Sequence, residues 1–453
     1  MARSSQNNFG SRLGIILATA GSAVGLGNIW RFPYMAGENG GAAFILIYIA
    51  FILLLGIPGM VSEFIVGRNG GSNAVRAYRR LSGVKHWRII GYMGVVSATL
   101  IFGFYSVVAG WCLQYLVASL SGGLHGDATS ISAYFMEFSA SAFLPVFWAV
   151  VFIFLTHLVV ARGIRGGIEK VSKLLMPILF VLLLIIVAAS CLLPGAERGI
   201  AFLFMPDFTK VDADTLLDAL GQAFFSLSLG VACLCTYASY FGKEVNLLKS
   251  AGQIALIDTL IAILAGLMIF PAAFSVGVNA DSGPSLIFIT LPNVFNQAFT
   301  SVPIIGYVIS VLFYALLALA ALTSTISMHA IGTAFFQEEM RLSRPKAVTV
   351  VSLVAAVIAV GSSLSMGAVP ELKLFDTPLL SCFDFLTAQI LMPVGAFLTC
   401  TYVGWFAPIA KVRDQFTNRG TVYANIFGGF LFVVRFICPV FILLIFLHEL
   451  GWI

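Results

Sequence analysis

Charged residues are scarce in this chain of 453 residues: Asp, Glu, Lys and Arg together make up 10%, whereas 60% of the residues are hydrophobic. A soluble globular protein carries about 25% charge, so the composition excludes that class. Long apolar runs recur from end to end, which predicts an all-α polytopic membrane protein with a single domain over residues 1–453. The net charge of +5 is spread over short loops and does not indicate a nucleic-acid partner.

Residue patterns typical of metal centres or of catalysis are also missing. Of the seven cysteines, Cys233 and Cys235 are spaced like a metal-binding pair, but no matching second pair exists, so packing is the favoured interpretation. The histidines His86, His157 and His329 do not occur with acidic residues in any catalytic spacing. We therefore expect a protein that is not an enzyme.

Eleven apolar runs are long enough to cross a membrane as helices. We expect them near residues 10–37, 41–68, 88–121, 141–161, 167–193, 215–241, 245–278, 304–337, 347–367, 375–406 and 423–450. Lys and Arg are concentrated in five loops that alternate with loops rich in Asp and Glu. The positive-inside rule therefore predicts a cytoplasmic N-terminus and, after eleven spans of the cell membrane, a C-terminus on the outer side.

The first apolar run is interrupted by small and polar residues between Gly21 and Asn28. A break in a spanning helix is tolerated at membrane depth only where it lines a cavity, because lipid offers the freed backbone groups no partners. A second interruption, Gly221–Ala232, occurs five helices later. Matched interruptions in two five-helix halves, about 10–193 and 215–406 with an extra helix near 423–450, indicate a transport site. Close packing through glycine is the alternative explanation.

Acidic and hydroxyl side chains also fall within the apolar helices. A carboxylate at Asp258, in the seventh helix, is costly unless it is paired or protonated. It therefore predicts either a cation site or a protonated Asp bonded to a neighbouring helix. Glu63 is predicted either to accept backbone amides freed by a broken helix or to lie close to the membrane interface. The hydroxyl run Thr323–Thr325 suits an alkali cation, although such hydroxyls also bond to their own preceding turn.

Charged residues near the first interruption are candidates for a gate. Arg31 follows the interruption, and Asp376 and Asp384 begin the tenth predicted helix. Arg31 paired with one of these carboxylates would form an outer gate, and an anchor at the membrane interface is the other interpretation. The loop 279–303 has Pro284 and Pro292 around a short apolar stretch, which predicts an external cap or a re-entrant hairpin.

Together these motifs resemble the neurotransmitter:sodium symporters, in their bacterial branch, over nearly the whole chain. The motifs that carry the resemblance are Gly21–Asn28, Arg31–Pro33, Glu38–Gly41, Phe225–Gly230, Thr236–Tyr240 and Leu322–Ser324. The resemblance implies the inverted five-helix repeat of the leucine-transporter fold, with helices 1 and 6 broken. It also implies sodium-coupled import by alternating access.

The resemblance implies two sodium sites. The first would be formed by the Ala23 carbonyl, the side chains of Asn28 and Ser226, Asp258, and the substrate carboxylate. The second would be formed by the carbonyls of Gly21, Val24 and Ala320 and the hydroxyls of Thr323 and Ser324. Animal relatives need chloride to balance charge here, whereas Asp258 supplies a negative charge, so no chloride requirement is expected. Asp258 is either a direct sodium ligand or the group that replaces the anion.

The substrate implied by the resemblance is a zwitterionic L-amino acid. Its carboxylate would meet the amides of Leu26 and Gly27 and the hydroxyl of Tyr105, and its ammonium the carbonyls of Ala23, Phe225, Ser226 and Ser228. The side-chain pocket would be lined by Ile101, Tyr105, Phe225, Val231, Ser324 and Met328. Because this lining carries no charge, we expect a large apolar or aromatic side chain, as in Trp, Tyr, Phe or Leu.

One departure from the family concerns the inner gate. Glu338 matches its usual acidic residue, but Gln6 and Phe9 stand about where the family commonly has Arg and Trp, with Arg3 nearby. Two alternative functions stay open. One is a proton-coupled carrier of the same fold, driven by titration of Asp258, and the other is an amino-acid sensor that binds without transport.

Overall fold

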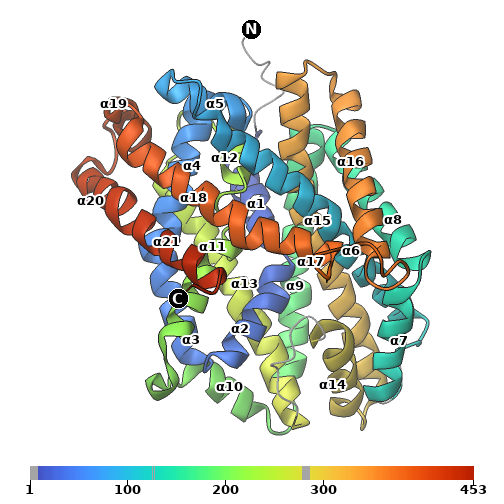
Figure 1. The fold of residues 1–453 in the computed structure, drawn as a ribbon. Helices are drawn as coiled ribbons and strands as arrows, with labels where there is room; N and C mark the ends of the chain where they lie inside the picture. The colour runs from blue at the N-terminus through green and yellow to red at the C-terminus, as the bar shows by residue number, and fades with distance from the viewer. Residues whose placement is uncertain (1–8, 125, 127, 278–285, 453) are drawn as a thin grey trace.

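The computed structural model describes residues 9–124, 126, 128–277 and 286–452, which form a bundle of helices (Figure 1). Within this part of the chain, nine helices are long and apolar enough to span a membrane, or ten if the bent pair Arg12–Ala23 and Gly27–Glu38 is one span. The interrupted segment between Ala213 and Ala238 is not among them. The predicted count of eleven spans therefore remains a prediction.

The spans follow the predicted apolar runs closely, as for the run 88–121, which forms α6 (Arg88–Leu120). Helicity is dictated by the membrane, where each backbone N–H and C=O needs a partner within its own segment. The remaining spans are α3 and α4 (Ala42–Phe51, Ile57–Gly70), α8 (Leu144–Ala161), α9 (Lys170–Cys191), α13 (Leu247–Ser275), α15 (Pro303–Glu339), α16 (Arg344–Leu364), α17 and α18 (Leu379–Asp384, Met392–Thr401), and α20 and α21 (Phe427–Phe432, Cys438–Glu449).

Short helices cap both ends of the bundle. Figure 1 shows α5 (Ala74–Ser82) and α19 (Ile409–Phe416) at one end, and α10 (Ala196–Phe204) and α14 (Leu291–Ala298) at the other, with α7 (Ala128–Ala140) to one side. Both α5 and α19 belong to loops rich in Lys and Arg. Because α5 and α19 lie at the same end of the bundle, these two basic loops are on one side, as the alternation of basic and acidic loops predicts. Which side faces the cytoplasm remains a prediction.

The interrupted helices occupy the middle of the bundle. They are α1 and α2 (Arg12–Ala23, Phe32–Glu38) and α11 and α12 (Ala213–Ser226, Cys233–Ala238), drawn in violet-blue and green in Figure 1. Helix α1 packs against α9, α13 and α15, α11 packs against α3, and α12 packs against α4. Both interruptions are thereby shielded from lipid.

The start of the tenth predicted helix needs correction. The helix begins at Leu379, because Lys373–Leu374 and Thr377–Pro378 pair as a short antiparallel hairpin. Asp376 occupies the turn of this hairpin with φ of 61°, in the left-handed region. It is therefore an exposed turn residue and not part of a membrane helix.

Part of the predicted cap in the loop 279–303 is described, whereas its Pro284 lies outside the described residues. The described part forms a helical turn, Leu286–Thr290, that continues into α14. Leu286 and Ile287 are fully buried, and the Tyr314 hydroxyl donates to the Ile287 carbonyl at 2.8 Å. This segment thus packs into the end of the bundle as a cap.

Candidate functional site

The first helix interruption brings backbone close to two other helices. Helix α1 ends at Ala23, Val24 is extended, and the chain resumes as a π-helical turn at Gly27–Arg31, with a bend of 56° between the two halves. A Cβ atom on Gly25 would lie 2.5 Å from the Ser324 hydroxyl oxygen and 3.2 Å from that of Tyr105. Glycine is required there so that the backbone can approach both side chains.

The second interruption, Leu227–Ala232 between α11 and α12, is held open by a buried acid. Glu63 is only 1% exposed, and its carboxylate accepts the amides of Gly230 at 2.8 Å and Cys235 at 3.2 Å. Gly230 has φ of 83°, and a Cβ atom there would collide with the Met392 carbonyl. Of the two interpretations of Glu63, the structure supports the one in which it binds amides freed by the break.

The residues predicted for the first sodium site meet between the two interruptions. The Asn28 side-chain amide donates to the Asp258 carboxylate at 2.8 Å and to the Ser226 hydroxyl oxygen at 3.2 Å. The Ser226 hydroxyl in turn donates to Asp258 at 2.6 Å. All three residues are almost fully buried, and Ala23 ends the neighbouring helix α1. The resulting oxygen-rich cluster with one carboxylate fits a hard monovalent cation.

The residues predicted for the second sodium site also converge, around the carbonyl of Val24. The hydroxyls of Thr323 and Ser324 donate to the Val24 carbonyl at 3.3 and 3.1 Å, and Thr323 also lies 2.9 Å from the Ala320 carbonyl oxygen. A Cβ atom on Gly21 would lie 3.4 Å from that of Thr323. These neutral oxygens from α1 and α15 make a second donor set suited to sodium.

Groups predicted to bind the substrate backbone lie beside these clusters. The Leu26 amide donates to the Tyr105 hydroxyl oxygen at 3.1 Å, so two of the groups predicted for the substrate carboxylate already face each other. A Cβ atom on Gly27 would lie 2.9 Å from the Phe225 ring. The amide of Ser228, which has φ of 53°, donates to the Phe225 carbonyl at 3.0 Å. Polar groups from α6 and from both interruptions are thus brought together.

The predicted side-chain pocket is supported less directly. Val231 is 3% exposed, and Ile101 and Met328 are half-buried against the apolar core. Their role in substrate selection therefore remains a prediction.

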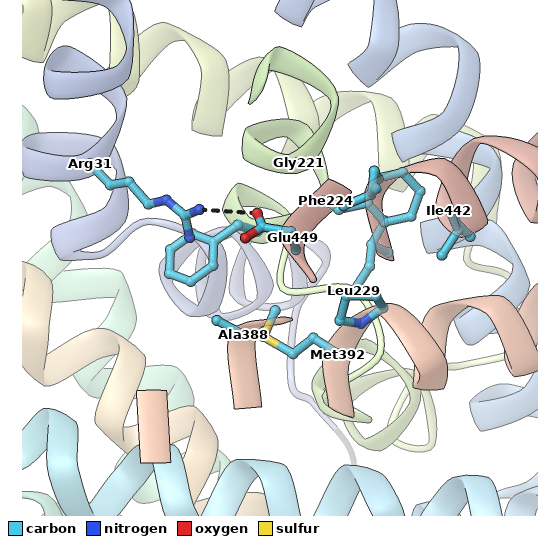
Figure 2. A pocket seen from close by; sticks show the side chains of 11 residues that line it. Arg31, Gly221, Phe224, Leu229, Ala388, Met392, Ile442 and Glu449 are labelled. Atoms are coloured by element: carbon cyan, nitrogen blue, oxygen red, sulfur yellow. Dashed lines mark ion pairs between the residues drawn. The ribbon is translucent and has the colours of Figure 1, made fainter. Parts of the chain in front are cut away.

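Arg31, predicted for an outer gate, contacts a residue that the sequence did not indicate. The guanidinium of Arg31 lies over the Phe225 ring, 4.3 Å from its centroid, and 3.9 Å from the Glu449 carboxylate of α21 (Figure 2). Asp384, on α17, interacts electrostatically with Arg31. Among the described residues, however, its carboxylate forms no ion pair with Arg31 within 4.0 Å. Asp376, in the exposed hairpin turn, forms no described ion pair either.

At the opposite end, the acidic residue predicted for the inner gate contacts α5. Glu338 accepts both the backbone amide of Asn73, at 2.8 Å, and its side-chain amide, at 3.0 Å. Phe9 packs on Tyr237 and Tyr240, with ring centroids 6.0 and 6.2 Å away. Arg3 and Gln6 lie outside the described residues, so a gate formed with them remains a prediction.

Sequence reasoning missed two residues of this region. The Tyr48 hydroxyl lies 3.4 Å from the Asp258 carboxylate, and Glu449 pairs with Arg31. Tyr48 lies in an apolar run, and apart from its hydroxyl nothing in the surrounding sequence indicates a functional role. Glu449 is an acid at the end of a span, a position typical of an ordinary interface residue.

Two interrupted helices that meet in the bundle centre, with oxygen clusters around the breaks and backbone groups that bond to side chains there, are typical of membrane transporters that bind ions and substrate midway across the bilayer. Sequence comparison then gives the family. The chain belongs to the Sodium:neurotransmitter symporter family, whose profile it matches over residues 6–137 and 133–451. This is a family of transporters and not of enzymes, as predicted.

Individual relatives agree with this assignment. The chain is 39% identical over 443 residues to the sodium-dependent transporter YhdH of Bacillus subtilis, covering 97% of both chains. It is 32% identical over 466 residues to a sodium-dependent transporter of Haemophilus influenzae, covering 98% of both. The crystal structure of MhsT in complex with L-phenylalanine superimposes with a TM-score of 0.88 and 39% identity, over 98% of this chain and 99% of that one. The predicted fold class and family are thereby confirmed.

Proposed function

We propose that this protein is a sodium-coupled symporter that imports a hydrophobic or aromatic L-amino acid by alternating access. The observation that carries the proposal is the contact of Asn28 with both Ser226 and Asp258, which joins the two helix interruptions in one buried polar cluster. Such a junction places freed backbone groups and a cation site side by side. The phenylalanine bound to MhsT supports the substrate class.

The proposed first sodium site consists of Ala23, Asn28, Ser226 and Asp258, completed by the substrate carboxylate. Asn28 directs its Nδ2 atom toward Asp258 and its Oδ1 atom toward the Gly25 amide, so ligation requires the carboxamide oxygen to turn toward the ion. Because Asp258 contacts both Asn28 and Ser226, we favour the interpretation that Asp258 binds the sodium ion directly and does not merely balance its charge from a distance. Because this carboxylate balances the charge of the ion, chloride is not required.

The proposed second site consists of Gly21, Val24, Ala320, Thr323 and Ser324, which all provide neutral oxygens. Its members come from α1 and α15, so an ion here would hold the first interruption against a neighbouring long helix. Loss of this ion would loosen the contact of α1, the half of the interrupted span nearer to the predicted cytoplasmic side, with α15. The substrate would thus be released on the side where sodium is scarce.

Two sodium ions supply enough free energy for concentrative uptake. One charge crossing 100 mV yields about 2.3 kcal/mol, and a tenfold sodium gradient adds about 1.4 kcal/mol per ion. The sum for two ions is roughly 7 kcal/mol, which corresponds to a substrate gradient of about 10⁵ at full coupling.

The decisive experiment measures uptake of radiolabelled Phe, Trp, Tyr and Leu into proteoliposomes with sodium or potassium outside. We expect accumulation that requires sodium, persists when gluconate replaces chloride, and collapses when gramicidin dissipates the gradient. Uptake in sodium-free buffer under an imposed pH gradient would establish the proton-coupled alternative. Saturable binding without accumulation would establish the sensor.

A further inference from the structure

The end of α21 covers a cavity at the outer side of the second interruption. Residues of α11, α18 and α21 line this cavity, together with Arg31 and Ala388, and Phe225 is among those from α11. Figure 2 shows the side chains that line it, with Arg31, Ala388, Met392 and Glu449 labelled. Helix α21 belongs to the extra helix that follows the two predicted five-helix halves. It nevertheless places the Glu449 carboxylate close to Arg31, whose guanidinium lies over the ring of Phe225, a predicted substrate residue.

Arg31 is held from two directions in this cavity. Its guanidinium stacks over the Phe225 ring at 4.3 Å, and one of its nitrogens lies 3.9 Å from Glu449. The Asp384 carboxyl, on α17, interacts electrostatically with the same cation from beyond ion-pair distance, so two acids from different helices act on Arg31. Movement of α17 or α21 relative to Arg31 would change which acid is nearer to it.

The end of α21 is also docked on the helix that carries Phe225. His448 lies 3.8 Å from Asp214 near the start of α11, and α11 and α21 pack against each other. Arg31 and Glu449 keep 29% and 21% of their side-chain surfaces exposed. An ion pair screened by solvent to this degree is weak, as a contact that breaks in every transport cycle must be.

We propose that Glu449 is a second carboxylate of the outer gate, which positions Arg31 over Phe225 and so slows release of the bound amino acid to the outside. The inference rests on the proposed function, because it takes Phe225, predicted to line the substrate pocket, as the side chain that covers the bound amino acid from the outside. Asp384 is one of the two acids that the sequence predicts for this gate, and we assign Glu449 the same task. Glu449 is a positioning residue, since it acts through Arg31 and does not contact the substrate.

Dissociation of tritiated L-phenylalanine from the full-length protein tests the proposal. After dilution into sodium buffer with unlabelled phenylalanine, we expect Glu449→Gln to release label about two- to fivefold faster, the range of an exposed ion pair. The sodium concentration for half-maximal binding should not change. Glu197→Gln, which changes an exposed acid on α10, is the matched control and should behave like the wild type.

A double-mutant cycle with Arg31→Gln separates gating from a general loss of structure. If Glu449 acts through Arg31, Glu449→Gln should add no further acceleration in the Arg31→Gln background. Equal acceleration in both backgrounds, or a wild-type rate for Glu449→Gln alone, would overturn the proposal. Glu449→Asp, which keeps the charge, should release label more slowly than Glu449→Gln, and a rate as fast as that of Glu449→Gln would also count against it.

A second readout needs no substrate. A cysteine placed in the cavity by Ala388→Cys should react faster with a membrane-impermeant maleimide when Glu449→Gln is also present, after subtraction of labelling in the parent chain. Unchanged labelling would refute the gate even if the protein transports phenylalanine. Conversely, faster labelling in a protein that binds no amino acid would uphold the gate and refute the proposed function.

Discussion

Asn28 and Asp258 form a hydrogen bond of 2.8 Å that joins the first helix interruption to α13. Asp258 accepts a second hydrogen bond, of 2.6 Å, from Ser226 at the end of α11. The carboxylate therefore links all three segments that would surround the first sodium ion. A buried charge with only hydrogen-bond donors around it remains costly, and a bound cation removes that cost.

Substitution Asp258→Asn tests whether this carboxylate replaces chloride. The amide keeps the size of the side chain but removes its charge, so we expect sodium-dependent uptake in gluconate buffer to fall by at least about tenfold, or 1.4 kcal/mol. Added chloride should restore part of the lost uptake, because an anion can then balance the ion. Wild-type uptake measured in both buffers is the control. A variant that is as active as the wild type without chloride would show that Asp258 has no electrostatic role.

Glu63→Gln tests how the second interruption is kept open. The amide retains one acceptor oxygen but turns an N–H group toward a backbone amide, which leaves a buried donor unsatisfied at a cost of roughly 1–3 kcal/mol. We expect a lower temperature of thermal inactivation together with weaker amino-acid binding. Glu137→Gln, at an exposed position on α7, should change neither. Full binding and unchanged stability in Glu63→Gln would contradict the role assigned to this carboxylate.

The interruptions could be predicted because their cause is local. Glycine and polar residues within an apolar run are visible along the chain, and Glu63 and Asp258 stand out as charges in membrane helices. The surroundings of Arg31 could not be predicted completely because they depend on packing between distant segments. The contact of Arg31 with Glu449 requires α21 to lie across α11, and the exclusion of Asp376 requires the pairing of a hairpin only two residues wide on each side.

Tyr105→Phe tests the predicted contact with the substrate carboxylate. The hydroxyl oxygen already accepts the Leu26 amide at 3.1 Å, so its loss removes one donor to the substrate and one fixed partner of the interruption. Substrate affinity should fall by about 1–3 kcal/mol, measured by equilibrium binding in saturating sodium. Tyr115→Phe is a matched control on the same helix, since the Tyr115 hydroxyl is buried without a hydrogen-bond partner among the described residues. An affinity loss of the same size in both variants would remove Tyr105 from the site.

Thr323→Val tests the second sodium site with little change in shape. Val replaces the hydroxyl by a methyl group, so α15 loses one of the two oxygens that face the Val24 carbonyl. The sodium concentration for half-maximal amino-acid binding should rise roughly two- to tenfold, the equivalent of about 0.5–1.5 kcal/mol. Apparent affinity for the amino acid at saturating sodium should change much less, because Thr323 is not among the residues predicted to bind the substrate.

Thr325→Val is the matched control for this prediction. Thr325 lies on the same helix and is fully buried, but its hydroxyl donates to the Leu322 carbonyl at 3.0 Å and lies 2.9 Å from the Thr156 hydroxyl oxygen on α8. Its loss should lower stability without changing the sodium dependence, because the side chain faces away from Val24. If both valine variants shift the sodium dependence equally, the effect comes from packing of α15, and the oxygens around Val24 do not form a sodium site.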